Sequence, residues 1–154
     1  WPGAEAAAAR VATVDLSSLG LVVSASHDAR EVYESDFLEG AVVEYELDGT
    51  VVAIFTALRF PSVSEAGSAF SRFESWAEQS CMRWRYTHLT NTGVIHCDLA
   101  GAHDRMLWHE HWILDIEVAD LPAGNLEDLS GPELADRIRD AAAASWHSSA
   151  SGSS

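Results

Sequence analysis

The chain has 154 residues, of which 47% are hydrophobic, and this is enough for a single domain with a buried core. Its 24 acidic and 9 basic residues give a formal net charge of −15, a field that repels phosphate backbones, so nucleic acid is excluded as an expected partner. No apolar run approaches the roughly 18 residues that cross a bilayer, so no transmembrane segment is predicted.

The two ends of the chain are predicted to lie outside the folded domain. Residues 1–10 are rich in alanine without a clear period and are expected to form a flexible arm. Residues 148–154 read SSASGSS, which is typical of a disordered tail. A single domain is therefore predicted over residues 11–147.

The clearest local signal in the chain is a β-hairpin. Two strand-like runs, 42–47 and 50–60, flank the Asp-Gly pair at 48–49. Asp-Gly favours a two-residue type I′ turn, because both central residues of that turn need a positive φ. Counting outward from the turn pairs Tyr45 with Val52.

An amphipathic helix is predicted directly after this hairpin. Ser62 and Glu65 have the spacing of a capping box, in which each side chain satisfies a backbone N–H at the start of the helix. A stripe of apolar residues then recurs at steps of three and four and is expected to face the core: Ala66, Ala69, Phe70, Phe73, Trp76 and Ala77.

The second half of the chain predicts a three-stranded meander and a closing helix. The strands are expected at 82–90, 94–100 and 105–119, joined by loops of three and four residues, and a second Ser-x-x-Glu capping box begins at Ser130. Without βαβ alternation, this order indicates an α+β fold. We expect an antiparallel sheet of about five strands (hairpin, helix, three-stranded meander, helix) with the helices packed on one face.

Histidines in the meander form the one pattern with a chemical interpretation. His109 and His111 lie two apart in the sequence WHEHW, and on a strand this step places both imidazoles on one face. The expected loop lengths put His96 opposite His109 and His88 opposite His96, with Asp98 on the same face. Such a set suits zinc or another divalent transition metal.

Two alternatives to the metal site remain open. The same residues could form a solvated sheet face that is rich in histidine, or a face that responds to pH. Glu110 also departs from the expected register, because it would point toward the core between Trp108 and Trp112. It is therefore paired, near an edge, or a sign that the register is different.

The two cysteines and the absence of sequence motifs bound the chemistry further. Cys81 and Cys97 permit one disulfide, with a reduced buried pair as the alternative. The sequence contains no Gly-x-Ser-x-Gly, Gly-x-Gly-x-x-Gly, Walker A or Cys-x-x-Cys motif. A protein without enzymatic activity is therefore favoured over an enzyme, and no catalytic residue is assigned.

The segment VVAIFTALRFPSVSEAGSAFSRFESWAEQSC carries a resemblance to a known family. Its motif consists of Phe60-Pro61-Ser62, Ala66, Ala69-Phe70, Trp76 and Cys81. It resembles the extracytoplasmic sensor domains of mycobacterial receptor Ser/Thr kinases and related actinobacterial lipoproteins. The resemblance implies a secreted or surface-anchored ligand-sensing domain without catalysis. That family usually has two disulfides, whereas this chain can form one.

Three functions follow as expectations. The first is a non-catalytic extracytoplasmic binding or sensor-like domain for a protein or small-molecule ligand; the start at Trp1, without a hydrophobic leader, favours a chain whose signal peptide has been removed. The second is a metal-binding protein or metal-dependent enzyme. The third is an accessory subunit of a larger assembly that covers exposed Trp108, Trp112 or Trp146. The strong negative charge leaves the cytoplasm of a salt-adapted organism as an alternative location.

Overall fold

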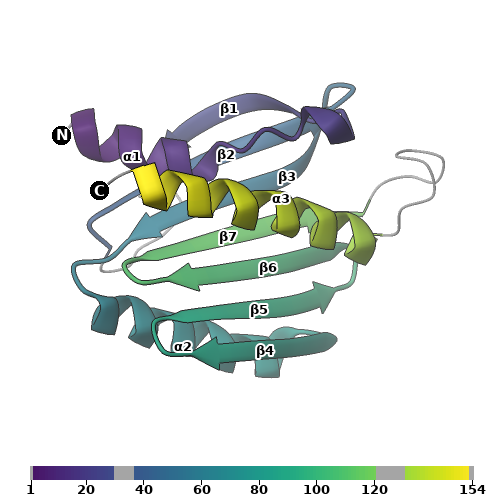
Figure 1. Cartoon of the computed structure of the whole chain (residues 1–154). Helices are drawn as coiled ribbons and strands as arrows, with labels where there is room; N and C mark the ends of the chain where they lie inside the picture. The colour runs from purple at the N-terminus through teal and green to yellow at the C-terminus, as the bar shows by residue number, and fades with distance from the viewer. Residues whose placement is uncertain (1, 30–36, 121–130, 153–154) are drawn as a thin grey trace.

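The computed structural model describes residues 2–29, 37–120 and 131–152, and describes side chains within 7–29, 37–120 and 131–145. Its centre is a seven-stranded antiparallel sheet in the order β1-β2-β3-β7-β6-β5-β4 (Figure 1). The strands are β1 (Val22–Asp28), β2 (Glu39–Leu47), β3 (Thr50–Arg59), β4 (Arg83–Leu89), β5 (Thr92–Leu99), β6 (Ala102–His109) and β7 (Trp112–Ala119). The helices are α1 (Pro2–Ala12), a 3₁₀ turn η1 (Ser17–Leu19), α2 (Val63–Ser80) and α3 (Gly131–Gly152). The predicted α+β class and antiparallel sheet are confirmed, with more strands than the five expected.

Helices cover both faces of the sheet, so the prediction of helices on one face was wrong. Helices α1 and α3 lie on one face, and α2 lies on the other (Figure 1). The reason is visible in the central strands, where neighbouring residues are both buried: Val42 packs toward α2 and Val43 toward α1 and α3. A strand that is apolar on both sides needs cover on both sides.

The β2–β3 hairpin closes through the predicted turn. Asp48 has φ 51° and Gly49 has φ 83°, as a type I′ turn requires. A β-bulge beyond Tyr45 shifts the register by one residue, so that Tyr45 pairs with Ala53 and not with Val52. In this register, Tyr45 lies on the same face as its ring contact Phe55, toward α1 and α3.

The two ends of the chain are helical where a flexible arm and a disordered tail were expected. Helix α1 begins at Pro2, and α3 continues to Gly152. Buried Tyr45 anchors the end of α1: its hydroxyl donates to the Ala12 carbonyl and accepts from the Val14 N–H, each at 2.7 Å. Sequence periodicity does not detect this anchor, because it depends on a contact across 31 residues or more.

Helix α2 begins as predicted, with the Ser62 hydroxyl accepting from the Glu65 N–H at 3.1 Å. Most of its apolar stripe is buried, but Trp76 is 40% exposed and lies outside the core. The helix carries the chain from β3 to the far edge of the sheet, where β4 starts the return toward β3 (Figure 1). Ser130, the expected cap of α3, lies outside the described residues.

The meander has four strands, because the predicted strand 105–119 is divided into β6 and β7. A turn at 110–111 pairs His109 with Trp112, and Glu110 there has φ 53°. The turn is held by hydrogen bonds: the Glu110 N–H donates to the Asn91 carbonyl, and the Glu110 carbonyl accepts from the Trp108 indole, each at 2.8 Å. This break explains why Glu110 did not fit the predicted strand register: it lies in the turn and does not point toward the core.

Candidate functional site

The four histidines of the predicted metal site do not share a face. The turns at 90–91 and 100–101 are both shorter than expected, so His88 pairs with Gly93, and His96 pairs with Arg105. The register between β4 and β5 differs from the expected one by an odd number of residues. Such a shift moves every side chain of the strand to the opposite face. His88 consequently faces α2, where its Nδ1 lies 2.6 Å from Glu74 Oε1 and its ring packs on Phe70.

The His-x-His pair is separated by the turn between β6 and β7. His109 is the last residue of β6 and lies on the same face as His96. It pairs with Thr92, which is four residues from His96 along β5, so the two histidines are about 13 Å apart. His111 lies in the turn itself. Within residues 2–29, 37–120 and 131–152, no group of three His, Cys, Asp or Glu side chains is placed to hold a metal ion.

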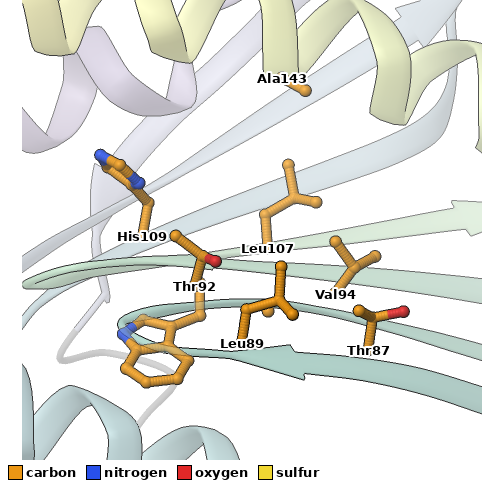
Figure 2. Close-up of a pocket in the computed structure, with 9 residues that line it drawn as sticks. Thr87, Leu89, Thr92, Val94, Leu107, His109 and Ala143 are labelled. Carbon is orange, nitrogen blue, oxygen red and sulfur yellow. The ribbon is translucent and has the colours of Figure 1, made fainter.

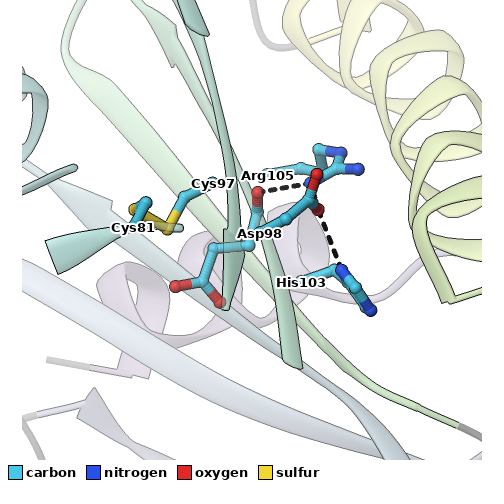
Figure 3. Close-up of a disulfide and its surroundings, with 6 residues drawn as sticks. Cys81, Cys97, Asp98, His103 and Arg105 are labelled. Carbon is cyan, nitrogen blue, oxygen red and sulfur yellow. Dashed lines mark hydrogen bonds and ion pairs between the residues drawn. A yellow bond between two sulfur atoms is a disulfide. The ribbon is translucent and has the colours of Figure 1, made fainter. Parts of the chain in front are cut away.

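A buried cluster of charged residues lies between the sheet and the first half of α3. Its centre is Arg105, which is 1% exposed and points from β6 toward the helix. The guanidinium donates from Nε to Asp136 on α3 at 2.9 Å. It also donates from Nη1 to Asp98 on β5 at 3.1 Å (Figure 3). Burial raises the pKa of the Asp98 carboxyl, but hydrogen bonds from His103 and Arg105 lower it below its usual value on balance. Asp98 is therefore a member of an ion-pair cluster.

His103 belongs to the same charged cluster, although it was not among the site residues predicted from the sequence. Its Nδ1 lies 2.8 Å from Asp98 Oδ1, and its Nε2 lies 2.6 Å from Asp120 Oδ1. Both ring nitrogens of His103 therefore contact a carboxylate oxygen. The signal available in the sequence was the alternation His103, Arg105, Leu107, which places two basic residues on one face of β6.

His96 forms the part of this cluster that lies nearest β4. The Arg139 Nη1 lies 2.5 Å from its Nε2, Arg85 Nη2 lies 3.4 Å from its Nδ1, and Asp136 Oδ1 lies 3.6 Å from the same Nδ1. Burial, together with the charges of Arg105, Arg139 and Arg85, lowers the pKa of His96 to about 4. The ring is therefore neutral at physiological pH, and because its Nε2 accepts from Arg139, its Nδ1 carries the hydrogen.

An apolar pocket adjoins the charged cluster, further along α3 and nearer its C-terminus. The pocket has a volume of about 190 Å³ and lies between Ala143 of α3 and strands β4 to β6 (Figure 2). We call it the α3 groove, and it is lined by Thr87, Leu89, Thr92, Gly93, Val94, Leu107, Trp108, His109 and Ala143. In Figure 2, Leu89, Val94 and Leu107 point from the sheet toward the helix. An engineered apolar cavity of about 150 Å³ holds benzene, so this volume suits a ligand of similar or slightly larger size.

The opposite face of β5 carries the disulfide between Cys81 and Cys97 (Figure 3). Cys81 caps the C-terminal end of α2, so the bond joins that helix to the sheet. Asp104 is paired with Cys97 on this face. Burial and the neighbouring carboxylates Asp115 and Glu117 raise the pKa of Asp104 to about 8.

Three tryptophans were expected to be exposed and to be covered by another subunit, and the structure places them differently. Trp108 is buried against Phe70, with ring centroids 5.3 Å apart, and Trp112 is half-buried. The side chain of Trp146 lies outside the described residues. The exposed tryptophans among the described side chains are Trp76 and Trp84.

Comparison with known proteins supports the fold and leaves the function open. No family model and no curated protein matches the chain. A solved structure of a GTP binding regulator from Thermotoga maritima is similar, with a TM-score of 0.52, 14% sequence identity and 72% of each chain covered. At this identity the likeness concerns the arrangement of helices and strands alone.

Proposed function

We propose that this chain is a non-catalytic ligand-binding domain that acts outside the cytoplasm and takes a small ligand into the α3 groove. The observation that carries the proposal is the groove itself: a 190 Å³ space with apolar walls, open between a helix and the edge of a sheet. Binding pockets are typically apolar with a few polar groups at defined positions, and Thr87, Thr92 and His109 supply such groups here.

The disulfide supports the proposed location. Disulfides persist in oxidising compartments and are rare in the cytosol of most organisms. Cys97 is fully buried and joined to Cys81 on the α2 face. This agrees with the sequence resemblance to extracytoplasmic sensor domains, which implies export and ligand sensing. Mass spectrometry of the non-reduced protein tests the location, since free thiols at both cysteines would count against it.

The binding function is tested by filling the groove from the helix side. Ala143 lines the groove, so Ala143→Leu places three further carbon atoms in it while keeping a residue that favours helix. The control is Ala144→Leu, because Ala144 is the next residue of α3 and is exposed.

The measurement is a titration of ¹⁵N-labelled protein with 1-octanol, followed by backbone amide shifts. We expect shifts at Val94, Leu107 and Ala143 in the unaltered protein and in Ala144→Leu, and their loss in Ala143→Leu. A titration that moves no groove amide, or moves them equally in Ala143→Leu, would contradict the proposed function.

A further inference from the structure

We infer that the ligand of the α3 groove is a monocarboxylate with a short apolar tail, whose head group is bound by Arg85 and His96. The inference rests on the proposed function and adds to it the chemical class of the ligand. The observation behind it is the position of the charged cluster, which lies directly beside the groove on each of the four elements that form the groove.

The groove and the charged cluster are next to each other on every element. Two residues along a strand return to the same face after about 7 Å, and four residues along a helix return after about 6 Å. On each of the four elements, one lining residue has a charged or polar neighbour at that step: Thr87 and Arg85, Val94 and His96, Leu107 and Arg105, Ala143 and Arg139. A ligand in the groove that extends toward the start of α3 therefore meets guanidinium and imidazole groups.

Of the three arginines in the charged cluster, Arg85 differs from the other two in its partners. Arg105 is engaged by Asp98 and Asp136, and Arg139 contacts Asp140 at 2.8 Å. Within the part of the chain that the structure describes, Arg85 has no carboxylate partner, and its contact is with His96 at 3.4 Å.

Arg85 lies close to the groove, because it is two residues along β4 from Thr87, which lines it. Arginine binds carboxylates with two parallel hydrogen bonds, which gives such a site its selectivity for planar anions.

His96 supplies a second donor to the same head group. Its pKa is lowered to about 4, so the ring stays neutral, and its Nε2 accepts from Arg139. The Nδ1–H is then the donor of this ring, and Nδ1 lies 3.4 Å from Arg85 Nη2 and 3.6 Å from Asp136 Oδ1. A carboxylate between Arg85 and this N–H would accept from both, whereas an ammonium group, which can only donate, would meet two donors and be repelled.

The test compares octanoate with 1-octanol, which has the same tail and no charge. Isothermal titration calorimetry on the full chain at pH 7 measures both ligands. Because hydrogen bonds to a charged group contribute more than neutral ones, we expect octanoate to bind at least about tenfold more tightly. Arg85→Gln should bring octanoate down to the affinity of octanol and leave octanol unchanged.

The matched control is Arg83→Gln. Arg83 lies on the same strand and the same face as Arg85, one step further from the groove, and it is also exposed. We expect it to retain the preference for octanoate. Equal affinities in the unaltered protein, or an equal loss in Arg83→Gln, would overturn the carboxylate site while leaving the groove in place. Absence of binding by either ligand would overturn the groove as a binding site and the head-group site with it.

Discussion

The Cys81–Cys97 disulfide is expected to contribute about 3 kcal/mol to the free energy of unfolding. The two cysteines are 16 residues apart in sequence, and closing a loop of this length in the unfolded chain removes entropy worth about 3 kcal/mol at 25 °C. The closed loop contains the connection from α2 to β4, the whole of β4 and most of β5. Since β4 is an edge strand whose residues are all exposed, packing alone holds it weakly.

The assay is urea unfolding followed by circular dichroism, with the oxidised and the reduced protein compared. Reduction keeps both sulfur atoms, so it isolates the loop term, whereas a Cys81→Ser, Cys97→Ala double variant adds the loss of packing at fully buried Cys97. We expect a loss of about 3 kcal/mol on reduction and a somewhat larger loss in the variant. A loss below about 1 kcal/mol on reduction would refute the loop argument.

Two further predictions concern the α2 face of the sheet. Gly93→Ala should destabilise the domain by about 1–3 kcal/mol in the same urea assay, because its Cβ would lie 2.4 Å from Phe70 Cε2; unchanged stability would mean that this close approach is not real. Asp104→Asn should become more stabilising, relative to the original protein, as pH rises. The pKa of Asp104 is raised from 3.8 to about 8 by burial and by Asp115, so the folded state holds a proton that the unfolded state has released, and stability falls between these pH values. Unfolding at pH 5 and at pH 8 measures this difference, and a gap that is the same at both would contradict it.

The candidate groove shows why the site could not be predicted from the sequence. Its walls come from β4, β5, β6 and α3, so residues as distant as Thr87 and Ala143 line one space. No local pattern encodes such a contact. The predicted metal site failed for a related reason: it depended on two loop lengths, and the shorter turns placed His88 and His96 on opposite faces.

Local chemistry in the sequence determined the elements whose signals act over a few residues. The Asp48-Gly49 turn forms because both residues tolerate a positive φ, and α2 starts at Ser62 because that side chain satisfies the helix N-terminus. The tertiary structure alone decided the break at Glu110, which is stabilised by a hydrogen bond to Asn91 from another turn. It also decided which strands lie at the centre of the sheet with helices over both faces, because the order of the strands is set by contacts between distant segments.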